Sequence, residues 1–162
     1  MKKYTIEKDQ QQKIVLTQPG EYLVELVGES AEAEIFGAFL VENNQHQEVK
    51  VVVRHLAAHT RAQTMLKAVG RDGGVIKLAG KIIIEPDCPD SQSFLTERVL
   101  LLDETARAEA VPDLEIKTDD VKCSHAASVS SLPEDEIFYL MSRGLTRKVA
   151  EGLVVEGFLE VG

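Results

Sequence analysis

The chain contains no tryptophan, and phenylalanine and tyrosine supply only 5% of its 162 residues. A core built from this composition has to rely on Val, Leu, Ile and Ala, which favours stacked layers of aliphatic side chains. The same scarcity argues against a carbohydrate-active β-solenoid, because such an enzyme needs aromatic platforms and a cluster of catalytic acids.

Only two cysteines occur, Cys88 and Cys123, and neither belongs to a C-x-x-C pair. Two thiols are too few for a disulfide framework, and a closed zinc site needs four ligands. We therefore expect free thiols, as in a reducing cytoplasm, and no structural zinc site formed by this chain alone.

Long apolar runs are missing as well. No stretch of about 18 apolar residues occurs, and the N-terminal sequence MKKYTIEKDQQQK is polar where a signal peptide carries its apolar segment. These absences predict a soluble, cytoplasmic protein with no membrane partner.

Positive charge is not clustered anywhere in the chain. Residues 1–80 contain ten Lys and Arg and ten Asp and Glu, whereas residues 81–162 contain eight and seventeen, so the net charge of −9 arises in the second half. A nucleic-acid surface needs grouped cations that displace counterions from phosphates. We therefore expect no DNA or RNA partner.

Motifs of common catalytic sites are also absent: the chain has no Walker A sequence, nucleophile elbow, H-E-x-x-H pair or G-x-G-x-x-G loop. We expect a protein that is not an enzyme and has no ATPase activity of its own. Any use of ATP has to come from a partner.

What the chain does contain is a series of short apolar runs, which recur every 10 to 15 residues between about residues 14 and 117. This interval suits successive strands. Val49, Val51 and Val53 alternate with Lys50 and Arg54, the period-two pattern of a strand with one buried face. The runs are 14–16, 22–27, 35–41, 49–56, 65–69, 75–84 and 99–102.

No sustained helical pattern precedes about residue 130, so the strands form a sandwich, a barrel or a parallel solenoid. Two features favour a parallel β-helix. The connection 43–47 is longer than a two-residue hairpin and begins with Asn-Asn, not with the Asn-Gly pair of a tight antiparallel turn. The aromatic plugs common in sandwiches are also scarce. Periodicity alone leaves the three architectures open.

The C-terminal segment reads differently. Ser131-Leu132-Pro133-Glu134 has the spacing of a capping box, and an apolar stripe of Ile137, Phe138, Leu140 and Met141 predicts a helix over about 133–143. Thr146 is the expected cap of a second helix, which carries Val149, Leu153 and Val154 on one face and ends near Gly157. These helices either cap the open end of a solenoid, cover its core or bind a partner.

Six segments occur in the order found in the SufB/SufD family of iron-sulfur cluster assembly scaffolds, which the chain resembles over about residues 50–160. Lys122-Cys123-Ser124-His125 followed by Ala126 is closer to the SufD branch, because the SufB branch places a glutamate after its histidine. The six segments are RHLAAHT (54–60), LAGKIII (78–84), VLLLD (99–103), PDLEI (112–116), DDVKCSH (119–125) and FYLMSRGL (138–145).

The resemblance implies a right-handed parallel β-helix over residues 1–130, which pairs with a SufB/SufD-like subunit or with a second copy of itself. It implies that the helical segment 131–162 binds a SufC-like ABC ATPase, with Phe138, Tyr139, Arg143, Gly144 and Leu145 in the contact region. Family members are usually more than twice as long, so the chain resembles a shortened scaffold.

Cys123 and His125 are the candidate ligands for iron or for a transient iron-sulfur cluster. They lie two positions apart, so in an extended strand both side chains face the same way. The alternative interpretations are a buried structural thiol and a hydrogen-bonded histidine at the end of a strand.

Other chemistry-bearing residues are weaker candidates. His55 and His59 have the spacing of a helical metal pair, but their surroundings predict a strand that runs into a turn. Asp119 and Asp120 are expected in a solvated turn. Cys88 is expected in a loop and without a functional role.

The sequence therefore predicts a scaffold or accessory subunit of SUF-type iron-sulfur cluster assembly that is not an enzyme. The alternative is a structural β-solenoid that assembles or binds other proteins and has no cluster chemistry.

Overall fold

The computed structural model describes residues 1–160, and within this range eleven strands precede two helices. None of the helices described is long and apolar enough to cross a membrane. The strands are β1 (Lys2–Ile6), β2 (Gln11–Leu16), β3 (Gly20–Leu26), β4 (Glu32–Val41), β5 (His46–His55), β6 (Arg61–Gly70), β7 (Val75–Ile84), β8 (Ser91–Leu101), β9 (Arg107–Ala110), β10 (Asp113–Ile116) and β11 (Val121–Ser131); the helices are α1 (Glu134–Ser142) and α2 (Arg147–Leu159).

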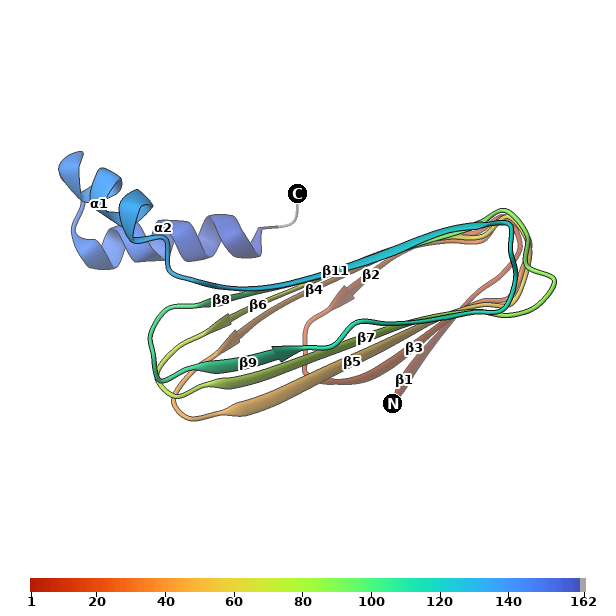
Figure 1. Cartoon of the computed structure of the whole chain (residues 1–162), viewed down its shortest axis with the longest axis horizontal. Helices are drawn as coiled ribbons and strands as arrows, with labels where there is room; N and C mark the ends of the chain where they lie inside the picture. The colour runs from red at the N-terminus through yellow and green to blue at the C-terminus, as the bar shows by residue number, and fades with distance from the viewer. Residues whose placement is uncertain (161–162) are drawn as a thin grey trace.

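The strands wind into a parallel β-helix with two facing sheets (Figure 1). One sheet has the order β1-β3-β5-β7-β10, with β9 beside β7, and the other has the order β11-β8-β6-β4-β2. Each strand pairs in parallel with the strand one coil away. The sequence-based prediction of a parallel solenoid followed by two short helices is confirmed, and the sandwich is excluded.

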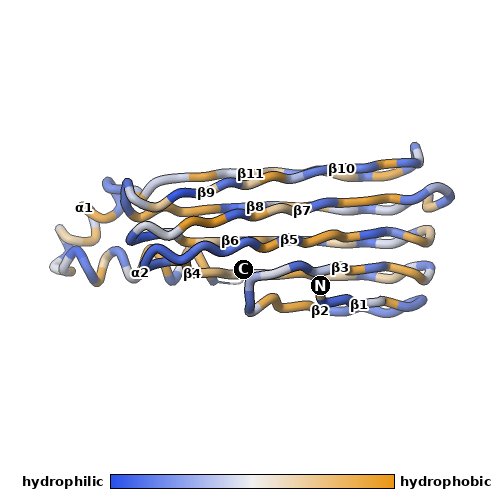
Figure 2. The backbone as a smooth tube through the Cα atoms, turned by 90° about the horizontal axis from the view of Figure 1, so that it is seen from below, coloured by the Kyte–Doolittle hydropathy of each residue, from blue (hydrophilic) through white to orange (hydrophobic). Residues whose placement is uncertain are grey.

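The coils lie on one another as layers, from β1 and β2 at one end to β10 and β11 at the other (Figure 2). Because paired residues of in-register parallel strands point the same way, inward positions stack into columns. Val24, Val53 and Ile82 form such a column across β3, β5 and β7, and all three are buried. The core is mostly aliphatic, as the composition predicts.

Corners of the solenoid are built from residues that tolerate a positive φ angle. Ser30, His59 and Asp90 have φ between 53° and 60° at equivalent turns. The amide of Ser30 donates to the carbonyl of Ala58 (3.2 Å), and that of Asp90 donates to the carbonyl of Asp120 (2.7 Å), so these turns are hydrogen-bonded from coil to coil. Asn and Asp adopt this conformation more readily than most residues do.

At the opposite corner, Asn43 and Asn44 both have a φ of 56°. The turn predicted at Asn43-Asn44 is therefore present, and it connects strands of different sheets.

Both predicted helices are present, and the N-terminal cap is as expected in α2 but not in α1. Ser131 is the last residue of β11, and the N-cap of α1 is Pro133, which offers no side-chain hydrogen bond, so the capping-box prediction is wrong. Thr146 caps α2 as predicted, because its side chain accepts from the amide of Val149. Helix α2 continues two residues beyond Gly157, to Leu159. Residues 161 and 162 of the expected helical segment lie outside the described residues.

Helix α2 lies along the outer face of the sheet that contains β6 and β8 (Figure 1). Three buried side chains, Leu132, Ile137 and Ala150, form a small core between the helices and the end of β11. The Lys67 ammonium group on β6 donates to the carbonyl of Glu160 (2.7 Å), and the Arg98 guanidinium on β8 lies 5.4 Å from the centre of the Phe158 ring. The tail is therefore fastened to the solenoid by a small core and two cationic contacts.

Candidate functional site

The C-terminal end of the solenoid leaves inward-facing side chains uncovered. Val129 on β11 pairs with buried Val99 on β8, so both residues point into the solenoid, yet Val129 is 48% exposed. At the opposite end the inward residues Ile6 and Ile14 are buried. Within the described residues, β11 is the last strand of its sheet and has one unpaired edge.

Cys123 and His125 lie on this uncovered face of β11. Their partners on β8 are Ser93 and Leu95, which are both buried, so the two candidate side chains point to the same side, as predicted for an extended strand. Cys123 is half-buried against the apolar cluster that contains Leu95, whereas His125 is exposed. Burial raises the pKa of the Cys123 thiol, and a hydrogen bond from the backbone of Ser93 offsets part of this effect. A thiol and an imidazole therefore face the open end.

The other histidine pair does not converge. His55 ends β5 and is fully buried, whereas His59 lies exposed in the following corner, 3.0 Å from the carboxylate of Asp90. Asp119 and Asp120 lie exposed in the bend before β11, as expected. None of these four residues joins a group of three or more His, Cys, Asp or Glu side chains that could hold a metal, and residues 1–160 contain no such group elsewhere.

A buried polar network surrounds His55. Its Nδ1 lies 2.7 Å from Oγ1 of Thr60, which lies 2.9 Å from Oγ of Ser91, and Thr60 also donates to the carbonyl of Ala57. Nε2 of His55 has no hydrogen-bond partner within the described part of the chain. Burial lowers the pKa of His55 to about 4, so the ring is neutral at neutral pH.

Cys88 lies in the loop between β7 and β8, as predicted, and takes part in the packing of this corner. Its side chain is buried between β7 and β8, and the thiol donates to the carbonyl of His55 (3.6 Å). Burial raises the pKa of this thiol, and the carboxylates of Glu85 and Asp87 add to the shift. Such a thiol is a poor nucleophile and acts here as a packed side chain.

Glu97 is the residue that sequence reasoning missed. It lies on β8, points into the solenoid and is fully buried, and neither of its carboxyl oxygens has a hydrogen-bond partner among residues 1–160. Burial raises its pKa to about 7, and the backbone of Gly80 offsets part of this shift. The sequence contained one weak signal. Glu97 lies two positions from Leu95 and two from Val99, so the alternation of β8 places it at an inward position.

The helical tail presents apolar side chains outward. Phe138 is 74% exposed, and Tyr139, Met141, Val149 and Leu153 are also exposed. The Arg143 guanidinium lies 5.2 Å from the centre of the Tyr139 ring, and Gly144 has a φ of 94°, which a residue with a side chain rarely adopts. Leu145 is half-buried beside them. The residues that were predicted to bind a partner are thus exposed, except for the half-buried Leu145.

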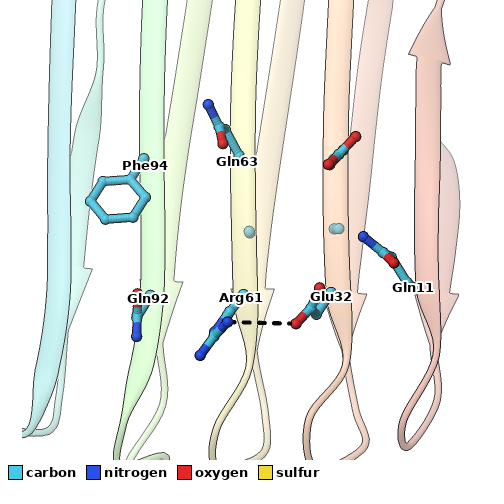
Figure 3. A pocket seen from close by; sticks show the side chains of 9 residues that line it. Gln11, Glu32, Arg61, Gln63, Gln92 and Phe94 are labelled. Carbon is cyan, nitrogen blue, oxygen red and sulfur yellow. Dashed lines mark ion pairs between the residues drawn. The ribbon is translucent and has the colours of Figure 1, made fainter.

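A shallow hollow of about 170 Å³ lies on the outer face of the β2-β4-β6-β8 sheet (Figure 3). Gln11, Gln63, Gln92 and Phe94 line it, and Arg61 pairs with Glu32 at 3.9 Å. None of its lining acids is buried. The hollow therefore has the character of a solvated sheet surface.

Comparison with known proteins gives a consistent result. The family model described as SUF system FeS cluster assembly, SufBD core domain, matches residues 15–158. An iron-sulfur cluster assembly SufBD family protein of Mycobacterium tuberculosis (strain ATCC 25618 / H37Rv) is 36% identical over 135 residues, which are 83% of this chain and 16% of that protein. Iron-sulfur cluster assembly protein SufB of Bacillus subtilis (strain 168) is 30% identical over 135 residues, with 83% of this chain and 29% of that protein covered.

The chain thus spans less than a third of the length of these two relatives. The matched region begins in β2 and ends in α2, so it includes nearly the whole solenoid and the helical tail. On this match, the chain belongs to the SufBD family of iron-sulfur cluster assembly proteins.

Proposed function

We propose that this chain is a scaffold or accessory subunit of SUF-type iron-sulfur cluster assembly and is not itself an enzyme. Iron and sulfide are its substrates, which it holds transiently at the open end of the solenoid. The observation that carries the proposal is the uncovered inward face of β11, where Cys123 and His125 point the same way. A thiolate and a neutral imidazole are ligands that suit iron.

The thiol of Cys123 has to lose its proton before it binds iron. Because burial raises its pKa, the free chain holds this group as a neutral thiol, and binding releases the proton to solvent. His125 is exposed on the same strand and needs no rearrangement to meet an incoming ion.

Anaerobic reconstitution with iron and sulfide tests this step. Wild-type protein should turn brown with broad visible absorption, and His125→Ala should lose most of that absorption. The matched control is His46→Ala, because His46 is also exposed but lies at the start of β5. Undiminished colour in His125→Ala would remove His125 from the proposed site, and colourless wild type would favour the alternative function, a structural solenoid.

We also propose that the open end binds a second subunit, either a copy of this chain or a SufB/SufD-like relative. An eleven-residue strand with an unpaired edge and exposed apolar side chains is a surface that proteins usually cover. A second solenoid placed there buries Val129 and extends the sheets.

Molar mass in solution tests this contact. Val129→Asp should convert a dimer to a monomer or abolish association with a SufB/SufD-like chain. Val15→Asp is the control, because Val15 is 52% exposed but faces outward from β2. Equal association of the two variants would show that the open end is not the interface.

We propose that the helical tail binds a SufC-like ABC ATPase. The ATPase hydrolyses ATP, for which this chain has no sequence motif. The exposed apolar surface around Phe138 and Tyr139 supports this proposal. Phe138→Ala should weaken co-purification with the ATPase, whereas Phe94→Ala, at a 41% exposed phenylalanine of the outer sheet face, should not. The two free cysteines fit a reducing compartment, and we propose the cytoplasm.

A further inference from the structure

Glu97 is a buried carboxyl group, and among the described residues only the backbone of Gly80 compensates it in part. It is 0% exposed, and neither carboxyl oxygen has a hydrogen-bond partner within residues 1–160. A buried and unpaired acid destabilises a fold, either as a desolvated charge or as a protonated group with unmade hydrogen bonds. A residue that destabilises the free chain in this way is a candidate for a role that the free chain does not show.

The opposite sheet leaves room for this carboxyl group. A Cβ atom on Gly80 of β7 would lie 2.9 Å from Oε1 of Glu97 and 2.5 Å from a methyl group of Leu95. The absence of a side chain at position 80 therefore opens the space in which the carboxyl group lies.

Glu97 lies one strand from the open end of the solenoid. Its partner on β11 is Ala127, and its neighbour Leu95 pairs with His125, so the His125 side chain is the diagonal neighbour of Glu97 on the same inward face. Adjacent strands lie about 4.8 Å apart and parallel strands rise about 3.3 Å per residue, so diagonal neighbours are roughly 8 Å apart, within reach of two long side chains. Ala127 is exposed and small, so little side-chain bulk lies between Glu97 and the open end.

We propose that Glu97 and His125 together bind one divalent transition-metal ion of the Fe²⁺ class at the open end, with Glu97 as the buried anionic ligand. This inference rests on the proposed function and adds an interior residue to its site. An ion about 2.0–2.2 Å from an imidazole nitrogen and a carboxylate oxygen spans this diagonal. Binding exchanges the proton of Glu97 for the metal, and water molecules complete the coordination.

The donor set suits such an ion. Imidazole and carboxylate together bind iron, manganese, cobalt and zinc, whereas Mg²⁺ and Ca²⁺ prefer oxygen ligands alone. Glu97 reaches the ion by turning from Gly80 towards Ala127. The bound cation then gives the carboxylate the partner that it lacks in the free chain.

The test uses Co²⁺ alone as a spectroscopic probe, with the metal-free full chain under anaerobic conditions and without sulfide. One Co²⁺ per chain should give visible d–d absorption. Glu97→Gln and His125→Ala should each weaken binding at least tenfold, while Glu34→Gln on the outer face of β4 and His46→Ala should not. Glu97→Gln replaces a buried acid with an uncharged side chain of the same size, so its melting temperature should equal or exceed that of wild type.

A second variant tests the access path. Ala127→Leu changes an exposed position that is not a ligand, and its larger side chain should block the ion from Glu97 and weaken Co²⁺ binding. Tight Co²⁺ binding that survives both Glu97→Gln and Ala127→Leu would overturn the inference, as would a wild type that binds no Co²⁺. Neither result affects association with a second subunit or with the ATPase, so the proposed function is judged separately.

Discussion

Gly80 and Glu97 face one another across the interior of the solenoid, and a Cβ atom on Gly80 would lie only 2.9 Å from Oε1 of Glu97. The backbone of Gly80 does not need glycine for conformational reasons, since its φ angle is not among the positive ones. Lack of space is the reason for glycine at this position. The two residues therefore form a matched pair, one large and polar and the other without a side chain.

Gly80→Ala should lower stability by about 1–3 kcal/mol, because the added methyl group also meets two methyl groups of buried Leu95. Gly152→Ala is the matched control: nothing lies within 4 Å of a Cβ atom on Gly152 in α2, so the change should stabilise the helix by roughly 0.5–1 kcal/mol. Urea denaturation measures both changes. Equal stability of wild type and Gly80→Ala would show that the interior adapts to the extra methyl group.

Glu97 should make stability fall as the pH rises from 4.5 to 7. The pKa of Glu97 is about 7 in the folded chain and 4.5 in the unfolded chain. Between these pH values the folded chain therefore holds a proton that the unfolded chain has lost. The associated stability is fully present below pH 4.5 and is lost above pH 7, and it amounts to at most about 3 kcal/mol. In metal-free protein with a chelator present, Glu97→Gln should remove this contribution, so the stability of the variant relative to wild type should rise from pH 4.5 to 7. A stability difference that does not change across this range would show that Glu97 does not titrate in this way.

His55 should produce the opposite slope over nearly the same pH range, so the contributions of His55 and Glu97 largely cancel in the wild type. Its pKa is lowered from 6.5 to about 4, so the unfolded chain takes up a proton between these values while the folded chain does not. The contribution is present above pH 6.5 and is lost as the pH falls to 4, again at most about 3 kcal/mol. His55→Asn keeps a donor for Thr60 and should remove this rise, so the stability of the variant should fall from pH 4.5 to 6.5 through the remaining Glu97 contribution. The control His46→Asn changes an exposed histidine and should leave the slope unchanged.

The strands could be predicted from sequence where their inward positions are apolar. The prediction failed where inward positions are polar. Strands β5 and β7 alternate cleanly and were predicted over most of their length. Strand β8 begins at Ser91, but only 99–102 was predicted, because its inward positions include Ser91, Ser93 and Glu97. Polar residues at inward positions break the pattern on which the prediction rests. The short strands β1, β9 and β10 were missed because they lie near the ends of the solenoid and bury few side chains.

The candidate site was predictable only in part. That Cys123 and His125 share a face follows from strand geometry, so the sequence sufficed. That this face is left uncovered depends on where the coils end, and the nearness of Glu97 depends on register between β8 and β11. Register brings together residues about 30 positions apart, and a single sequence contains no local signal for it.

Lys67 should hold the C-terminal end of α2 against the solenoid. Its side chain is nearly buried on β6, its ammonium group donates to the carbonyl of Glu160, and it lies 5.9 Å from the centre of the Phe36 ring. A hydrogen bond from a charged donor contributes about 1.5–3 kcal/mol, so Lys67→Met, which keeps the apolar stem, should speed amide exchange in the last turn of α2 by roughly tenfold or more. Global melting should change little, since the helix adds few contacts to the main core. Lys148→Met, at an exposed lysine in the first turn of α2, is the control, and equal exchange in the two variants would show that the Lys67 contact does not restrain the helix.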